Sequence, residues 1–288
     1  MRRLAHISDL HFSWVDPKVV EGLAAELDAD RPDLVIASGD FTQGARVAEF
    51  EQARAFLDRI AAPVLSVPGN HDITPYHLVQ RFFDPYRRYR RYISPEIEPV
   101  FQDDEIAVIG VNTARRFAFE LNWSYGRIND RQIARVSHVL RALPDGLFRI
   151  VVGHHPFLPP DEAPETRVVG GAAQALACFE AGGVGLVLAG HLHRGYARSL
   201  RPVLDGGEMT GAVEKAPQAS EARRLTVLQA GSATSTRLRN AEPNAYNRIT
   251  VDGNRARIEA RLWTGERFES AVRPGAEARA GEAARPAP

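Results

Sequence analysis

Short apolar runs alternate with longer segments of helical periodicity through the first two thirds of the chain. Apolar residues recur at helical spacing over residues 17–27, 46–60 and 131–143, where we expect amphipathic helices. Between them lie runs typical of buried strands, at residues 4–8, 33–38, 63–68, 105–111, 149–152 and 184–189. The repeated strand–turn–helix order predicts βαβ units, in which parallel strands end at the same edge of a sheet.

The last third of the chain has a different pattern. Apolar and polar residues alternate over residues 225–229, 246–251 and 256–263, which predicts antiparallel strands. Residues 205–221 hold few large apolar side chains and predict an exposed loop. Residues 271–288 are rich in Ala, Gly, Glu, Arg and Pro and predict a disordered tail. We therefore expect one folded domain over residues 1–270.

Residues 78–93 interrupt the alternation with an aromatic and basic stretch. Apolar positions 78, 82, 86, 89 and 93 fit one face of a single helix, with arginines around it. Two interpretations follow. In one, the helix docks on the core and its arginines face solvent. In the other, a segment of about residues 76–100 forms a cap that attracts an anionic substrate or a lipid head group.

Composition and charge narrow the class of protein. The 288 residues carry 36 Lys and Arg against 36 Asp and Glu, a balance that disfavours a non-specific binder of nucleic-acid polymers. The single cysteine, Cys178, excludes an intramolecular disulfide framework. No window has the apolar length of a membrane span, and the first residues are too short and polar for a signal peptide. We expect a soluble, cytoplasmic protein.

Five strand ends carry side chains that bind metals in other proteins. These are Asp9 and His11, Asp40, Asn70 and His71, His154 or His155, and His191 with His193. Each of these side chains taken alone is more often structural than functional, but the carboxyl ends of parallel strands are neighbours, so the five sets can converge. Carboxylate, amide and imidazole groups suit divalent ions such as Mn, Fe, Zn or Co. The donors are too many for one open catalytic ion and are enough for two.

Two adjacent ions form a clamp for phosphoryl transfer. They polarise the phosphoryl oxygens and hold a bridging hydroxide for in-line attack. A shared carboxylate, most plausibly that of Asp40, would bridge the pair. His71 follows Asn70 and is placed to give a proton to the leaving group.

The motifs Asp9-x-His11, Gly39-Asp40, Gly69-Asn70-His71-Asp72, Gly153-His154-His155-Pro156 and Gly190-His191-x-His193 resemble the signature of the calcineurin-like metallophosphoesterase superfamily. The resemblance covers residues 4 to about 263. Within that superfamily the chain is similar to bacterial class III cyclic-nucleotide phosphodiesterases and their glycerophosphodiesterase relatives. The resemblance implies an α/β fold, a four-layer αββα sandwich of two mixed β-sheets.

The resemblance also implies roles for individual residues. Asp9, His11 and His193 would bind one metal, Asn70, His154 and His191 the other, and Asp40 both. His71 would be a catalytic histidine that binds no metal, and His155 would lie behind the ligands. Asp72 would either orient His71 or close the turn.

Several functions remain open at this point. We expect a phosphodiesterase acting on a small phosphodiester, either a cyclic nucleotide or a glycerophosphodiester. The alternatives are a pyrophosphatase of a nucleotide-linked membrane lipid such as UDP-diacylglucosamine, and a phosphomonoesterase. A scaffold that has lost the chemistry, and a nuclease, are less consistent with the intact ligand set and the neutral charge. The sequence leaves the oligomeric state open, a homodimer included.

Overall fold

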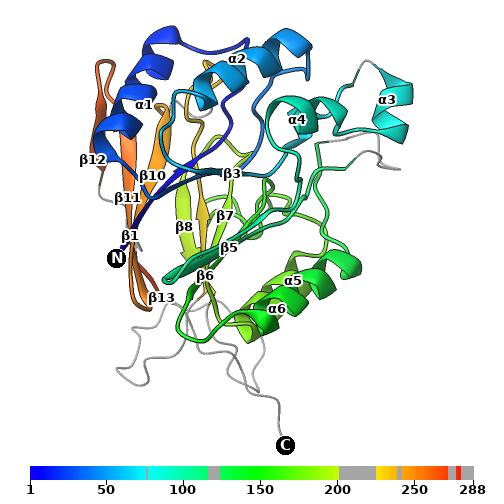
Figure 1. The fold of residues 1–288 in the computed structure, drawn as a ribbon, viewed down its shortest axis with the longest axis vertical. Coiled ribbons are helices and arrows are strands. Elements are labelled where there is room, and N and C mark those ends of the chain that lie inside the picture. The colour runs from blue at the N-terminus through cyan, green and yellow to red at the C-terminus, as the bar shows by residue number, and fades with distance from the viewer. Residues whose placement is uncertain (76, 116–123, 201–224, 239–241, 272–276, 280–288) are drawn as a thin grey trace, which may run out of the picture.

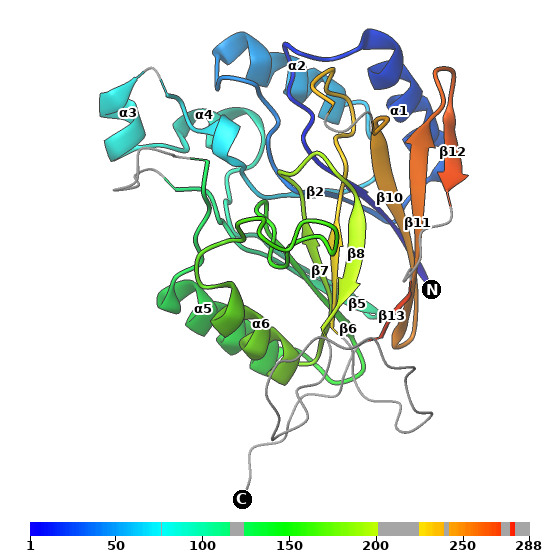
Figure 2. The same cartoon turned by 180° about the vertical axis from the view of Figure 1, so that it is seen from behind.

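The computed structural model describes the chain except for residues 76, 116–123, 201–224, 239–241, 272–276 and 280–288. Two β-sheets face each other, and helices cover the outer face of each (Figure 1). From behind, the two helical layers again lie on opposite sides of the sheets (Figure 2). The predicted four-layer αββα sandwich of two mixed sheets is confirmed.

The first sheet has the strand order β12-β11-β10-β1-β2-β3, and β13 pairs with β11. Strands β1, β2 and β3 are parallel, while β10, β11 and β12 are joined to them by antiparallel pairing. The strands are β1 Arg2–Ile7, β2 Leu34–Ala37, β3 Val64–Ser66, β10 Ala245–Asp252, β11 Arg255–Trp263, β12 Phe268–Ala271 and β13 Glu277–Arg279.

The second sheet has the order β4-β5-β6-β7-β9-β8, with parallel pairing from β5 to β9 and an antiparallel strand at each edge. Its strands are β4 Val100–Gln102, β5 Ile106–Gly110, β6 Phe148–Val152, β7 Val184–Ala189, β8 Tyr196–Ser199 and β9 Thr226–Gln229. The βαβ pattern is therefore divided between two sheets, which the residue pattern alone did not indicate.

Alternate residues of the central strands point into different cores. In β2, Leu34 and Ile36 enter the core between the sheets, whereas Val35 and Ala37 pack beneath the outer helices. In β7, Leu186 and Leu188 face the other sheet, and Val187 faces the helices on the opposite side. Burial on both faces explains why these strands are continuous apolar runs.

Helices α1 (Pro17–Asp30) and α2 (Val47–Leu57) cover the first sheet, and α5 (Asp130–Ala142) and α6 (Ala172–Ala181) cover the second (Figure 1). Their ends follow ordinary capping chemistry. The Asp16 side chain accepts a hydrogen bond from the Lys18 N–H at 2.9 Å, and Pro17 opens α1. Asn129 and Gln132 form a capping box at the start of α5.

The expected single helix over residues 78–93 is wrong. The chain forms α3 (Leu78–Phe83) and α4 (Arg87–Tyr92), because Pro85 disfavours a helical conformation at Asp84 and lacks an N–H of its own. The two parts have different environments. Tyr86 and Tyr89 are buried against the core under α2, whereas Val79 and Phe83 on α3 are 74% and 86% exposed. Helix α4 is therefore docked on the core, whereas α3 projects at one end of the sandwich (Figure 2).

The predicted loop at residues 205–221 lies outside the described residues. Most of the predicted tail from residue 271 also lies outside them, apart from β13, which pairs antiparallel with β11. Within the described parts of the chain, every helix is too short or too polar to cross a bilayer.

Candidate metal centre

The turns after five parallel strands bring the predicted site residues together. Atoms of Asp9, His11 and His193 that can bind a metal lie within 4.8 Å of one another, and so do those of Asp9, Asp40 and His154. The same spacing holds for His154, His155 and His191, and for His11, Asp40 and His71. Asn70 and His71 belong to the 3-10 helix η1 (Asn70–Asp72) that follows β3.

Five of these residues have a left-handed backbone, an uncommon conformation for any residue with a side chain. Their φ angles are positive: Asp9 at 53°, His11 at 49°, Asp40 at 55°, His191 at 75° and His193 at 54°. Such strain persists only where the surroundings hold it. Backbone hydrogen bonds do so here, from the Asp9 N–H to the Gly39 carbonyl at 3.1 Å and from the His11 N–H to the Asp40 carbonyl at 3.0 Å.

Asp9, His11 and His193 form the first group of donors. The Nε2 atoms of His11 and His193 are 3.0 Å apart, and Asp9 Oδ1 lies 3.6 Å from the first and 3.3 Å from the second. The other oxygen, Asp9 Oδ2, accepts hydrogen bonds from the Ser8 hydroxyl at 2.6 Å and from the His191 N–H at 2.9 Å. The carboxylate is thus fixed by one oxygen and presents the other to the two imidazoles.

Asp40 lies between this group and His154. Its Oδ2 atom is 3.1 Å from His154 Nε2 and 3.7 Å from His11 Nε2, while its Oδ1 accepts the His71 N–H at 2.8 Å. His154 Nδ1 donates to the Ser38 carbonyl at 2.7 Å, so Nε2 carries the free lone pair in the neutral ring. An oxygen between two sets of imidazole nitrogens has the position that a bridging ligand requires.

His155 lies behind this group with both ring nitrogens engaged. Its Nε2 donates to the Ser124 carbonyl at 2.9 Å, and its Nδ1 accepts from the Thr113 hydroxyl at 2.8 Å. Binding a metal would break one of these bonds, whereas His154 loses none. The contacts thus favour His154 as the donor.

The His71 ring is held in place by one hydrogen bond and one ring contact. Its Nδ1 donates to the Gln43 carbonyl at 2.6 Å, and its ring meets the His11 ring edge to face, with the centroids 4.9 Å apart. Asp72 closes the turn instead of contacting the His71 ring. Its carboxylate accepts from the Gly69 N–H at 2.9 Å and from the Thr42 N–H at 3.1 Å.

The ionisation of the site follows from burial and mutual contact. Burial alone would raise the pKa of the Asp9 and Asp40 carboxyls, but the histidines beside them hold both pKa values well below the ordinary range. Burial also opposes a charged His154, yet Asp40 raises the pKa of this imidazole to about 9. A divalent ion must displace that proton, so metal affinity should increase as the pH rises toward 9.

The donors present fit a pair of divalent ions. Among the described residues, Asp9 Oδ1, Asn70 Oδ1 and His154 Nε2 are buried without a hydrogen-bond partner, which is costly unless a ligand satisfies them. The 3.0 Å between the His11 and His193 nitrogens suits two donors that each lie about 2.0–2.1 Å from one ion. Imidazole and carboxylate donors are those that Mn, Fe, Zn and Co accept.

Three residues outside the predicted set hold the donors in place. Thr113 Oγ1 accepts the N–H groups of His154 and His155, each at 3.2 Å, and Ser8 and Ser38 contact Asp9 and His154. Each of the three is a small polar residue at a strand end, and that position is the signal by which they could have been found.

Known proteins that are similar to this chain indicate its family. Residues 2–195 match the family model described as calcineurin-like phosphoesterase, which covers more than half of the chain. The chain belongs to the calcineurin-like phosphoesterase family. The resemblance inferred from the motifs is thereby confirmed, and the matched segment contains every proposed ligand.

Two curated relatives illustrate the likeness. The glycerophosphodiester phosphodiesterase GpdQ of Enterobacter lignolyticus is 38% identical over 80 residues, which are 24% of this chain and 29% of that protein. The 3',5'-cyclic adenosine monophosphate phosphodiesterase CpdA of Escherichia coli is 27% identical over 210 residues, 67% of this chain and 70% of that protein.

Solved structures support the fold alone. The purple acid phosphatase PPD1 from yellow lupin (Lupinus luteus) has a TM-score of 0.66 at 12% sequence identity, covering 93% of this chain and 52% of that one.

Proposed function

We propose that the chain is a metal-dependent phosphodiesterase that hydrolyses a small phosphodiester of the cyclic-nucleotide or glycerophosphodiester type. The observation that carries the proposal is the position of Asp40 Oδ2 between His154 Nε2 at 3.1 Å and His11 Nε2 at 3.7 Å. This arrangement suits two ions, and the family relatives GpdQ and CpdA are named for these two substrate types.

We assign each residue a role in metal binding or proton transfer. Asp9, His11 and His193 would hold one ion, Asn70, His154 and His191 the other, and Asp40 would contact both. A bound pair of this kind supplies Lewis acidity and lowers the pKa of water. His71, fixed through Nδ1 to the Gln43 carbonyl, would hold the proton that the departing ester oxygen takes up. The Asp9 and Asp40 carboxyls are ready for a cation, since their low pKa values keep them ionised.

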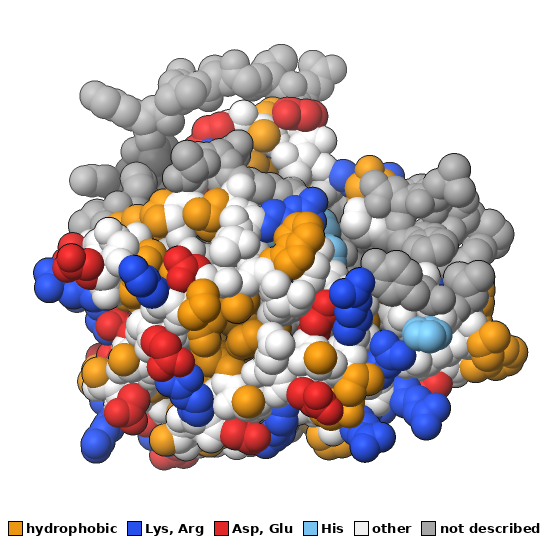
Figure 3. All heavy atoms as spheres, turned by 90° about the horizontal axis from the view of Figure 1, so that it is seen from above, with side chains coloured by type: hydrophobic (Ala, Val, Ile, Leu, Met, Phe, Trp, Pro, Cys, Tyr) orange, Lys and Arg blue, Asp and Glu red, His pale blue; other side chains and the backbone are white. Residues whose placement is uncertain are grey.

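The balance of 36 Lys and Arg against 36 Asp and Glu supports a small substrate over a nucleic-acid polymer. On the face drawn in Figure 3, acidic and basic side chains are interspersed, whereas a polymer needs an extended basic area. The single cysteine, Cys178, fits the reducing cytoplasm that we propose as the compartment.

One observation favours a second candidate, the pyrophosphatase of a nucleotide-linked lipid. Val79 and Phe83 expose apolar surface on α3, and arginines of α4 lie next to it, as expected where an acyl chain and a charged head group meet a protein. Tyr86 and Tyr89 are buried in the core, so among the described side chains of residues 78–93 the exposed large apolar ones lie on α3.

The test is a substrate panel on enzyme loaded with a defined metal. We expect Mn²⁺-loaded protein to hydrolyse a cyclic nucleotide or a glycerophosphodiester. Asp40→Asn should lose more than about 10²-fold in kcat/KM, because even residues that only support ligands cost 10–100-fold. Metal content measured by elemental analysis should fall with it. Selective hydrolysis of the nucleotide-linked lipid would replace the first candidate by the second, and inactivity on all diesters and pyrophosphates would reject both.

A further inference from the structure

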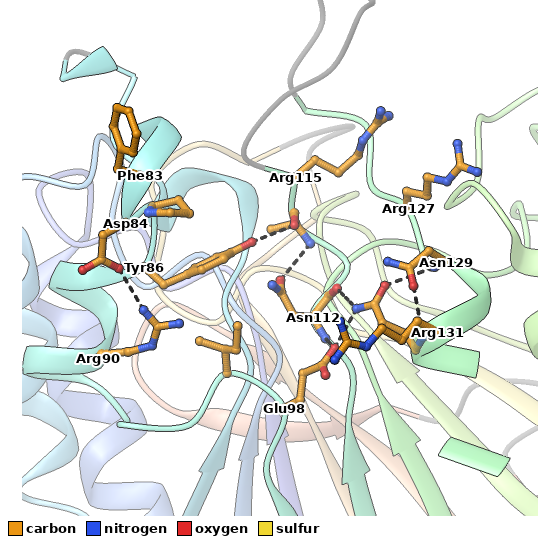
Figure 4. Close-up of a pocket in the computed structure, with 14 residues that line it drawn as sticks. Phe83, Asp84, Tyr86, Arg90, Glu98, Asn112, Arg115, Arg127, Asn129 and Arg131 are labelled. Carbon is orange, nitrogen blue, oxygen red and sulfur yellow. Dashed lines mark hydrogen bonds and ion pairs between the residues drawn. The ribbon is translucent and has the colours of Figure 1, made fainter. Parts of the chain in front are cut away.

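A cavity of about 690 Å³ lies beside the candidate metal centre. None of the proposed metal ligands lines this cavity. It opens between α3 and α4 on one side and the start of α5 on the other (Figure 4). Its floor includes Asn112 and Ala114, which follow β5. A cavity of about 300–1,000 Å³ is the usual size for a small-molecule site.

The charges in the cavity are unbalanced. Its two acids are already engaged: Asp84 pairs with Arg90 at 2.9 Å, and Glu98 pairs with Arg135 at 3.8 Å and accepts from the Gln132 amide at 2.6 Å. Three more arginines also line the cavity, namely Arg115, Arg127 and Arg131.

In the part of the chain that the structure describes, the guanidinium groups of Arg115, Arg127 and Arg131 have no carboxylate within 4 Å. In Figure 4, the side chains of Arg115 and Arg127 extend from the loops that face α4, and Arg131 lies at the start of α5. Three uncompensated guanidinium groups around one cavity make an environment for an anion, and this group binds phosphate oxygens in pairs of hydrogen bonds.

The rest of the lining suits an aromatic or apolar group attached to that anion. Phe83 is 86% exposed at one rim, and Tyr86 lies deeper, with its hydroxyl donating to the Ala114 carbonyl at 2.8 Å. An exposed phenyl ring beside cations can stack on a planar base, as aromatic side chains do in other nucleotide sites.

The cavity adjoins the metal centre through one residue. Asn112 and Ala114 line it and flank Thr113, whose Oγ1 accepts the His154 N–H at 3.2 Å. The arginines, by contrast, belong to the loop at residue 115 and to the segment 127–131. The cavity can therefore hold an anion without any contribution from the metal ligands.

We propose that this cavity is a second anion site, which binds the phosphate group of a nucleotide-sized molecule through Arg115, Arg127 and Arg131. Phe83 contacts the base or another planar part of the same molecule. The phosphate is either part of a separate ligand or the second phosphate of a nucleotide-linked substrate, since a cyclic nucleotide or glycerophosphodiester carries only the phosphate that reacts, and both sources share this chemistry.

The binding test uses the full-length protein freed of divalent metal by a chelator, titrated with AMP in a calorimeter. We expect one AMP to bind per chain, and binding should weaken as salt is raised. Arg115→Gln and Arg127→Gln should each weaken it at least about tenfold, in line with the loss of a charged hydrogen bond. Arg87→Gln is the matched control, since Arg87 lies on the same helix as Arg90 but does not line the cavity.

Comparing the binding of adenosine, inorganic phosphate and AMP distinguishes the phosphate contact from the contact with the base. Adenosine should bind far more weakly than AMP, and phosphate alone should still respond to Arg127→Gln. Absence of AMP binding to the metal-free protein would overturn the proposal, as would AMP binding that the arginine variants leave unchanged. Neither result depends on catalysis, so both are distinct from failure of the proposed phosphodiesterase activity.

Kinetics then identify the source of the phosphate. If the cavity holds an end of the substrate, Arg115→Gln should raise KM with little change in kcat. If it holds a separate ligand, the same variant should lose AMP binding while KM stays at the wild-type value.

Discussion

Thr113→Val is the most direct test of how the candidate metal centre is supported. Thr113 is fully buried, and its hydroxyl makes three contacts with two adjacent histidines. It accepts the N–H groups of His154 and His155, each at 3.2 Å, and donates to His155 Nδ1 at 2.8 Å. Valine keeps the shape and the methyl group but offers no oxygen, so three buried polar groups would lose their partner.

Each buried polar group left without a partner costs about 1–3 kcal/mol. The two long N–H contacts belong at the low end of that range, so we expect Thr113→Val to lower the free energy of unfolding by about 3–4 kcal/mol. That is a large share of the roughly 5–15 kcal/mol that stabilises a typical domain. Metal affinity should also fall by about 10–100-fold, as for other residues that hold a ligand in place.

Urea unfolding of the metal-free protein measures the first effect, and metal titration measures the second. Thr113→Ser is the matched control, because it keeps the hydroxyl and removes only a methyl group, worth about 1 kcal/mol. If the valine variant is no less stable than the serine variant, and binds metal as well, the hydroxyl does not support the histidines and the reasoning is refuted.

Three further experiments test other parts of the structure. His71→Asn should retain the metals yet lower kcat by about 10²–10⁴-fold, most for poor leaving groups; loss of metal would instead make His71 a ligand. Gly69→Ala places a Cβ 2.1 Å from Asp40 Oδ1 and should abolish metal binding, whereas Gly170→Ala, whose Cβ has no neighbour closer than 3.5 Å, should be tolerated. His6 is buried with its pKa lowered to about 3, so its own protonation should lower stability by about 1.4 kcal/mol per pH unit below about 6.5, in addition to the effect of other buried histidines. His6→Gln should flatten that slope in urea unfolding of metal-free protein, and an unchanged slope would contradict the assignment.

Much of the fold could be predicted because the strongest signals are local. The predicted strand at residues 184–189 coincides with β7, and the helix predicted at 131–143 differs from α5 by one residue at each end. Buried strands and amphipathic helices carry their own periodicity, so their positions follow from the residues. The convergence of the strand ends could be predicted too, because parallel strands meet at one edge.

The features of the fold that the hydrophobic pattern does not predict depend on contacts between distant segments. An apolar run such as residues 105–111 is the same whether its strand joins one sheet or the other, so the division into two sheets came only from the resemblance. The periodicity at residues 78–93 predicts one helix, but Pro85 divides it into α3 and α4. The sequence does not predict that the cavity arginines lie together, since Arg115 and Arg127 are far in sequence from the arginine-rich stretch.

The candidate metal centre also has a structural consequence, because its hydrogen bonds join the two sheets. His154 follows β6 of the second sheet and donates through Nδ1 to the Ser38 carbonyl of the first. His191 follows β7 and donates its N–H to Asp9 Oδ2, and the Ser232 hydroxyl, beyond β9, donates to the Asp9 carbonyl at 2.7 Å. The core between the sheets is apolar, and apart from polar contacts such as the 2.8 Å ion pair of Arg2 with Asp103 its packing does not fix their relative position along the strands. These polar contacts do fix it, so a substitution at Asp9 or His154 should loosen the sandwich as well as remove a ligand, and its effect on activity is interpretable only beside its unfolding free energy.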